Sequence, residues 1–128
     1  MTAVLIVDPN KSRAGELTRW LRLGGFHADS VETHDSALRF LRSNQVGTLV
    51  VSEDLGFDVF PSLLRSIKGS RATTIVLGNT RSAKNTTAVL DLGADCYMPD
   101  PYSAREVLAR IRSLSRLLAQ PPHNIVIP

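Results

Sequence analysis

The sequence predicts an α/β fold in which helices cover both faces of a parallel sheet. Residues 4–7 and 48–51 are apolar at nearly every position, which is typical of strands buried on both faces. Segments with helical spacing alternate with such runs, so we expect five strand–helix units in one domain. Ligands of such sheets bind at the carboxyl ends of the strands, and Asp8 directly follows the first strand.

The composition fits one globular domain and excludes several other classes of protein. The 128 residues are the length of one domain, with 43% hydrophobic and 21% charged residues. A net charge of +3 is too small an excess to indicate nucleic-acid binding. The single cysteine, Cys96, excludes an internal disulfide bond. Because we find no signal peptide and no apolar run near ~18 residues, we expect a cytoplasmic protein without membrane contact.

The first strand is followed by a helix over residues 11–23. Asn10 is a suitable N-terminal cap, and Gly24 ends the helix. Residues 26–31 form a second strand, whose lower apolar content places it near a sheet edge. Helical spacing resumes over residues 34–42.

The middle of the chain repeats this alternation. Residues 47–52 form the third strand, and Asp58 is a possible cap for a helix that extends to Ile67. Pro61 lies in the first turn of that helix, where its missing N–H costs little. Residues 73–77 form the fourth strand.

The last units comprise a helix over residues 82–92 with a thin apolar face, a short strand at 96–98 and a strongly amphipathic helix over 103–119. Residues 120–128 have the composition of a linker or of the start of a missing domain.

The order of these elements and three short motifs resemble the receiver domain of two-component response regulators over residues 1–119. The motifs are Val-Asp after the first strand, Leu-Asp-Leu-Gly-Ala-Asp at 90–95, and Pro-Tyr-Ser-Ala-Arg-Glu at 101–106. The resemblance implies a flavodoxin-like, doubly wound sheet of five parallel strands in the order 2-1-3-4-5 with five helices. It also implies that the bond before Pro101 is a cis peptide.

The family transfers a phosphoryl group to an aspartate after the third strand. An acidic pair after the first strand helps to hold Mg²⁺, and a hydroxyl residue and a lysine contact the phosphoryl oxygens. Here the neighbour of Asp8 is Pro9, and the acceptor position holds Glu53. Gly78 occupies the hydroxyl position and Asp100 the lysine position.

These departures predict a degenerate acidic pocket that kinases do not phosphorylate. Pro9 supplies no oxygen to Mg²⁺, Gly78 donates no hydrogen bond, and Asp100 repels a phosphoryl group. We therefore expect no catalytic residue, no cofactor and only weak binding of Mg²⁺. The pocket comprises Asp8, Pro9, Glu53, Asp54, Gly78 and Asp100.

Three further expectations concern this pocket. Asp8, Glu53 and Asp100 are expected to converge, with Arg81 or solvent neutralising them. Glu53 offers a fixed negative charge in place of a phosphoaspartate. Asp54, one position further along the chain, is an alternative phosphoryl acceptor. Strand alternation, however, is expected to turn its side chain away from the face of Glu53.

A second group of residues resembles the family's dimer face on the fourth helix, fifth strand and fifth helix. Tyr97 matches an aromatic residue that moves with activation in receivers, although it can also be an edge-strand aromatic lying on the fourth helix. The charged candidates for this face are Asp95, Arg105, Glu106, Arg110 and Arg116.

The sequence thus favours an atypical pseudo-receiver, which is not an enzyme and signals through this face to a second copy or another signalling protein. DNA would be contacted only by a missing output domain. The alternatives are a phosphorylatable receiver that uses Glu53 or Asp54 with Mg²⁺, and an acidic-pocket sensor of a metal or small ligand.

Overall fold

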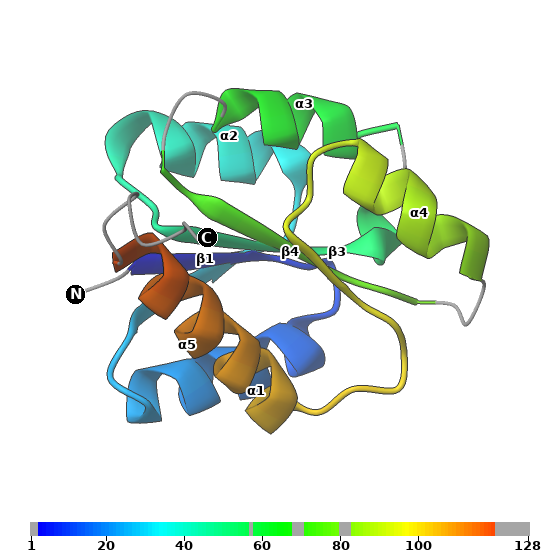
Figure 1. Ribbon diagram of the computed structural model, residues 1–128. Coiled ribbons are helices and arrows are strands. Elements are labelled where there is room, and N and C mark those ends of the chain that lie inside the picture. The colour runs from blue at the N-terminus through cyan, green and yellow to red at the C-terminus, as the bar shows by residue number, and fades with distance from the viewer. Residues whose placement is uncertain (1–2, 57, 68–70, 80–82, 120–128) are drawn as a thin grey trace, which may run out of the picture.

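The protein folds as a five-stranded parallel sheet in the order β2-β1-β3-β4-β5, as predicted (Figure 1). This computed structural model describes residues 3–56, 58–67, 71–79 and 83–119. The strands are β1 (Ala3–Val7), β2 (His27–Val31), β3 (Thr48–Ser52), β4 (Thr73–Leu77) and β5 (Cys96–Met98). The helices are α1 (Lys11–Leu23), α2 (His34–Ser43), α3 (Phe60–Ser66), α4 (Ala83–Asp91) and α5 (Ala104–Ala119), with a 3₁₀ turn η1 (Glu53–Leu55).

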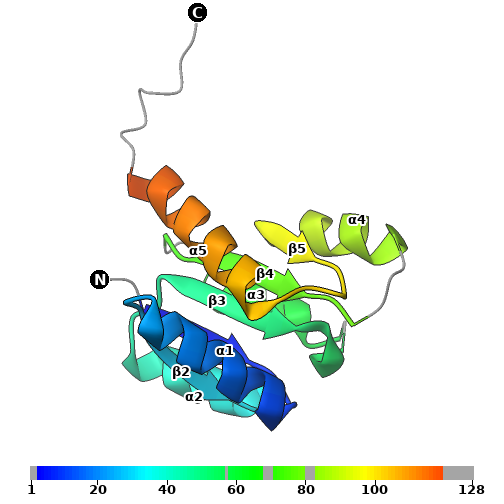
Figure 2. The ribbon, with the colours of Figure 1, turned by 90° about the horizontal axis from the view of Figure 1, so that it is seen from below.

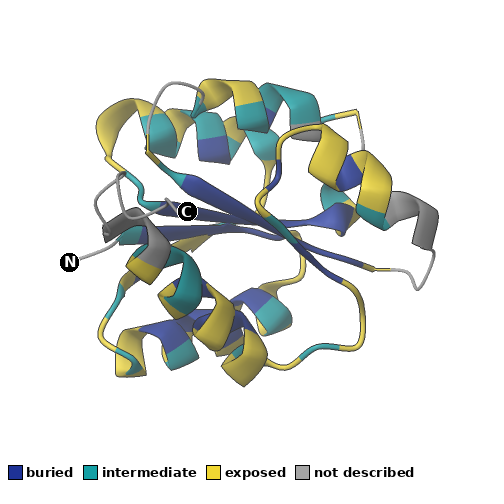
Figure 3. Ribbon diagram, in the orientation of Figure 1, coloured by how far each residue is buried: buried dark blue, intermediate teal, exposed yellow. Residues whose placement is uncertain are grey.

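The helices form one layer on each side of the sheet. α1 and α5 lie side by side on one face, and α2, α3 and α4 cover the other (Figures 1 and 2). Ile6 and Val50 pack toward α1 and α5, whereas Leu5 and Leu49 pack into the cluster on the opposite face. The central strands β3 and β4 are therefore buried throughout, and β1 is buried from its second residue on, as their continuous apolar runs predicted (Figure 3).

One expected helix cap is confirmed, and another is wrong. Asn10 Oδ1 accepts a hydrogen bond of 3.0 Å from the Arg13 amide at the start of α1. Asp58 does not cap α3, because that helix begins at Phe60 with Val59 as its N-cap and no capping side chain. The Asp58 carboxylate lies instead against Gly56, where an added Cβ atom would approach Asp58 Oδ1 to 2.7 Å. The Gly56 φ of +95° is also a backbone conformation that favours glycine.

The chain passes from β5 to α5 through a cis peptide bond between Asp100 and Pro101, which confirms the implication of the family resemblance. Within the described residues, no helix has the length and apolar character needed to cross a membrane. The expected linker at 120–128 lies outside the described residues.

Candidate functional site

Two buried carboxylates lie at the carboxyl edge of the sheet. Asp8 follows β1 and is 1% exposed, and Glu53 follows β3 and is 5% exposed. The strands β1 and β3 are adjacent and parallel, so the residues that follow them meet at one edge. Burying a carboxylate is costly unless it is hydrogen-bonded or paired with a cation, so the partners of these two groups decide what the site can do.

Arg13 is the partner of Asp8. Its guanidinium donates from Nε to Oδ2 and from Nη2 to Oδ1 of Asp8, each at 2.6 Å. The Asn10 amide also donates to Asp8 Oδ1 at 2.9 Å. The charge of Asp8 is therefore neutralised by Arg13, whereas Arg81, the counter-charge expected from the sequence, lies outside the described residues.

Glu53 is held by Tyr97 and by a backbone amide. The Tyr97 hydroxyl donates to Glu53 Oε1 at 2.7 Å, and the amide of Asn79 donates to the same oxygen at 3.2 Å. The Tyr97 ring is buried and belongs to the apolar cluster that includes Val89 of α4. Tyr97 is thus both a core aromatic beside α4 and the hydrogen-bond donor to the acceptor position.

Gly78 makes the inward position of Tyr97 possible. A Cβ atom at residue 78 would overlap the Tyr97 hydroxyl, and it would lie 2.8 Å from Cζ of that ring. It would also approach Glu53 Oε1 to 3.3 Å. The missing side chain at the hydroxyl position therefore has a positive role, because it leaves the space that the phenol fills.

Asp54 joins the two halves of the site. Its Oδ2 accepts from Arg13 Nη2 at 2.7 Å, and its Oδ1 accepts from Asn79 Nδ2 at 2.7 Å. These bonds, that from Arg13 first, lower the pKa of the Asp54 carboxyl. Glu53 and Asp54 face different partners because residues 53–55 form a 3₁₀ turn, not because strand alternation continues.

The same contacts shift the pKa of two other groups. Burial is the main cause that raises the pKa of the Tyr97 phenol, and the hydrogen bond to Glu53 raises it further. The hydrogen bond to Asp8 raises the pKa of Arg13. Both groups therefore keep their donor hydrogens at physiological pH.

Asp100 does not join this buried network. Its residue is exposed, and its charge reaches the site only as one of several influences on Tyr102. Burial is the main cause that raises the pKa of the Tyr102 phenol, and the Arg13 charge opposes that rise. Asp8 and Glu53 meet at this edge of the sheet, as expected, but they have separate partners. The charge of the exposed Asp100 acts on the same phenol, that of Tyr102, as the charges of Asp8 and Asp54.

The described residues contain no group of three or more His, Cys, Asp or Glu side chains that could hold a metal ion. The side chain of Pro9, which follows Asp8, has no oxygen that could bind a metal ion. Both carboxylate oxygens of Asp8 instead accept hydrogen bonds from the guanidinium of Arg13.

Several charged candidates for the dimer face have partners within the domain. Asp95 Oδ2 accepts from the Thr74 amide at 2.8 Å. Arg105 lies over the Trp20 ring of α1, with 5.6 Å between the guanidinium carbon and the ring centroid. Glu106 caps α5 through reciprocal hydrogen bonds with Ser103, both of 3.1 Å.

The other two candidates, Arg110 and Arg116, are exposed on α5. Arg110 lies near the middle of that helix, and Arg116 lies in its last turn. They stay candidates for contact with another molecule.

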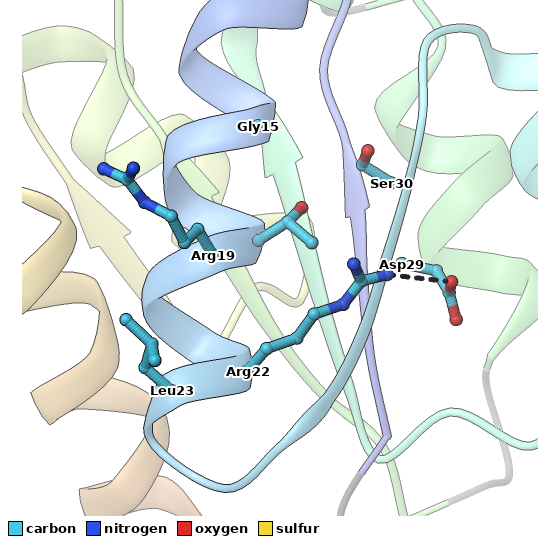
Figure 4. A pocket seen from close by; sticks show the side chains of 7 residues that line it. Gly15, Arg19, Arg22, Leu23, Asp29 and Ser30 are labelled. Atoms are coloured by element: carbon cyan, nitrogen blue, oxygen red, sulfur yellow. Dashed lines mark ion pairs between the residues drawn. The ribbon is translucent and has the colours of Figure 1, made fainter.

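A hollow between α1 and β2 is lined by residues outside this network (Figure 4). Arg22 Nη2 lies 3.6 Å from Asp29 Oδ1, and Arg22 Nε donates to the Ala28 carbonyl at 3.0 Å. Both charged side chains are largely exposed, so their ion pair has little energetic weight. Because these charges are already partnered, we assign no ligand to the hollow.

Arg13 and Asn79 were missed in the sequence. One signal pointed to Arg13: side chains in the first turn of a helix lean toward its N-terminus, which here is the loop that carries Asp8. No comparable signal marks Asn79, because its two contacts depend on how β4 lies beside β3.

Sequence comparison relates the chain to response regulators. It is 38% identical over 124 residues to the sensory transduction protein RegX3 of Mycolicibacterium smegmatis, a match that covers 91% of this chain and 51% of the relative. It is 30% identical over 117 residues to the response regulator MprA of Mycobacterium ulcerans, covering 88% of this chain and 50% of that protein. The chain thus spans about half the length of the curated relatives it matches. No protein-family model matches it.

Solved structures share the fold. The receiver domain of the Francisella response regulator 1452 superposes with a TM-score of 0.81 at 22% identity, over 91% of this chain and 98% of that chain. An atypical orphan response regulator, for which a phosphorylation-independent regulatory mechanism is described, superposes with a TM-score of 0.79 at 24% identity, over 90% and 96%. Over 91% of its length this chain is therefore similar to response regulators, and it has the fold of their receiver domains.

Proposed function

We propose that this receiver domain signals without phosphorylation and that Glu53 supplies a fixed negative charge at the acceptor position. The observation that carries the proposal is the 2.7 Å hydrogen bond from the buried Tyr97 hydroxyl to Glu53 Oε1. The aromatic residue at this position moves with activation in the family that the sequence resembles. A carboxylate that holds Tyr97 inward therefore maintains one conformation without a phosphoryl group.

The remaining contacts of the site support this proposal. A phosphorylatable aspartate must be free to attack, yet both oxygens of Asp54 accept hydrogen bonds, one from Arg13 and one from Asn79. The hydroxyl and lysine that would contact a phosphoryl group are replaced by Gly78 and Asp100. The bonds of Asp54 also disfavour it as a shifted acceptor.

The signal would leave the domain through the α4–β5–α5 face. Tyr97 lies on β5 and packs in one cluster with Val89 of α4, so its position is transmitted directly to that face. Exposed Arg110 and Arg116 on α5 offer contacts to a second copy or to another signalling protein. Because the curated relatives are about twice as long, we infer an attached output domain, such as a DNA-binding domain, as the controlled element.

A first experiment tests whether phosphate is accepted. The wild-type chain is incubated with Mg²⁺ and acetyl phosphate and its intact mass is measured, beside a phosphorylatable receiver as the positive control. We expect no adduct on this chain under conditions that fully label the control. A stoichiometric adduct that hydroxylamine removes would overturn the proposal, and its loss in Asp54→Asn or Glu53→Gln would identify the acceptor.

A second experiment tests whether the charge of Glu53 affects the α4–β5–α5 face through Tyr97. Backbone amide resonances are compared between the wild type, Glu53→Gln and the control Glu16→Gln, which alters an exposed carboxylate on α1. We expect Glu53→Gln to shift resonances of β5, α4 and α5, and Glu16→Gln to shift only its own neighbours. Shifts confined to residues next to Glu53 would show that the face does not respond to this charge.

A further inference from the structure

Mg²⁺, which the family resemblance implies for this edge of the sheet, does not fit the residues present. Mg²⁺ requires near-octahedral oxygen ligands at about 2.0–2.1 Å. Both Asp8 oxygens accept N–H donors of Arg13 at 2.6 Å, and Asp54 Oδ2 accepts a third at 2.7 Å. The same Nη2 lies 3.1 Å from Ser52 Oγ, so one cationic group already contacts the oxygens that a metal ion would need.

We propose that Arg13 is a tethered cation that replaces this divalent ion and makes the domain independent of Mg²⁺. The proposal rests on the position of one guanidinium among three oxygen-bearing side chains, those of Asp8, Ser52 and Asp54. It does not depend on the role proposed for Glu53, which has other partners.

The turn that leads from Asp8 into α1 is arranged to position Arg13. Asn10 links both ends of it, because its amide donates to Asp8 Oδ1 and its Oδ1 accepts from the Arg13 amide. The Arg13 side chain is 30% exposed, so its charge is partly withdrawn from water beside a carboxylate that is fully buried. Holding the guanidinium in place by several hydrogen bonds gives it the fixed position that a coordinated ion would otherwise have.

The choice of arginine is chemically specific. A planar guanidinium presents Nε and Nη2 as a fork that matches the two oxygens of one carboxylate, whereas a lysine ammonium approaches as a single point charge. Here that fork contacts Asp8, and Nη2 also reaches Asp54 across the site. Mg²⁺ added to the wild type would meet a positive charge at the position where its ligands lie.

Removing the guanidinium should expose an oxygen-only group of ligands. Arg13→Met keeps the apolar stem but leaves the buried Asp8 carboxylate without its cation, which destabilises a folded domain. The freed oxygens of Asp8, Asp54 and Ser52 are the type of ligand that Mg²⁺ prefers. A divalent ion that binds only the folded variant would then restore part of the lost stability.

The experiment compares thermal unfolding midpoints with and without millimolar MgCl₂ at matched ionic strength. The variants are wild type, Arg13→Met, Arg13→Met with Asp8→Asn, and the control Arg22→Met, which removes an exposed guanidinium of the same helix. We expect Mg²⁺ to leave the wild type and Arg22→Met unchanged and to raise the midpoint of Arg13→Met in a saturable manner. The double variant should lose that response, because its buried carboxylate is gone.

Two outcomes would overturn the proposal. One is a folded Arg13→Met variant whose midpoint matches the wild type and does not respond to Mg²⁺. The other is saturable Mg²⁺-dependent shifts of the Asp8 and Asp54 amides in the wild type, a measurement that stands even if Arg13→Met does not fold. A phosphate adduct on the wild type would instead refute the proposed function, and the two results are read separately.

Discussion

Replacing Tyr97 with phenylalanine tests the contact on which the proposed function depends. The variant keeps the buried ring and removes only the hydroxyl, so the apolar cluster around it should stay intact. Of the hydrogen bonds that the described residues give to Glu53, which is 5% exposed, the variant keeps the one of 3.2 Å from the Asn79 amide. A buried carboxylate that loses a donor suffers the cost of incomplete solvation.

The expected loss follows from the type of bond. A hydrogen bond to a charged group contributes about 1.5–3 kcal/mol, and the O···O distance of 2.7 Å is that of a well-formed one. We therefore expect Tyr97→Phe to lower the free energy of unfolding by about 1.5–3 kcal/mol. For a domain of this size, each kcal/mol corresponds to roughly 3–5 °C in the unfolding midpoint.

Urea denaturation measures this change, with the single tryptophan, Trp20, as a fluorescent probe. Tyr102→Phe is the matched control, because it removes the hydroxyl of the other tyrosine. Tyr102 is half-buried, and the tyrosine that donates to Glu53 is Tyr97. The double variant Tyr97→Phe with Glu53→Gln completes a thermodynamic cycle, which should give a coupling energy on the order of 1 kcal/mol or more. A loss below about 0.5 kcal/mol, or one equal to that of Tyr102→Phe, would refute a structural role for the bond.

Three further predictions use the same network. Gly78→Ala should force the Tyr97 ring out of the site, because the new Cβ would lie 2.8 Å from Cζ. We expect urea denaturation to show a free energy of unfolding lower by about 1–3 kcal/mol, and the pKa of the Tyr97 phenol to fall. If neither quantity changes, the packing of Tyr97 against Gly78 is contradicted. Both tyrosines have raised pKa values, so phenolate absorbance should rise only above pH ~10. The native state keeps protons that the unfolded state releases there, so stability falls as the pH rises past ~10, and it should fall less steeply in Tyr97→Phe. Asp54, with its lowered pKa, binds fewer protons when folded, and its stabilising effect is present above pH ~4 and lost as the pH falls through the native pKa. Asp54→Asn should make the loss of stability at acidic pH slightly less steep, and the effect is small because the side chain is 33% exposed. If the dependence of stability on acidic pH does not change, Arg13 does not favour the ionised form of Asp54.

The framework of the domain was predictable from local patterns. Continuous apolar runs located the buried strands β3 and β4, and helical spacing with a polar cap located α1 at Lys11–Leu23. These features depend on residues a few positions apart, whose spacing and turn chemistry are readable along the chain. The family resemblance then placed Asp8 and Glu53 at the sheet edge, where the structure has them.

The partner of Glu53 and the contact between Arg13 and Asp54 were decided by the tertiary structure alone. Tyr97 donates to Glu53 across 44 positions of sequence, and Arg13 reaches Asp54 across 41. Such contacts depend on strand order, helix placement and the space that Gly78 leaves, none of which has a periodic signature. The sequence by itself therefore determined the fold and the position of the acidic edge, whereas only side-chain packing determined that a guanidinium and a phenol fill it.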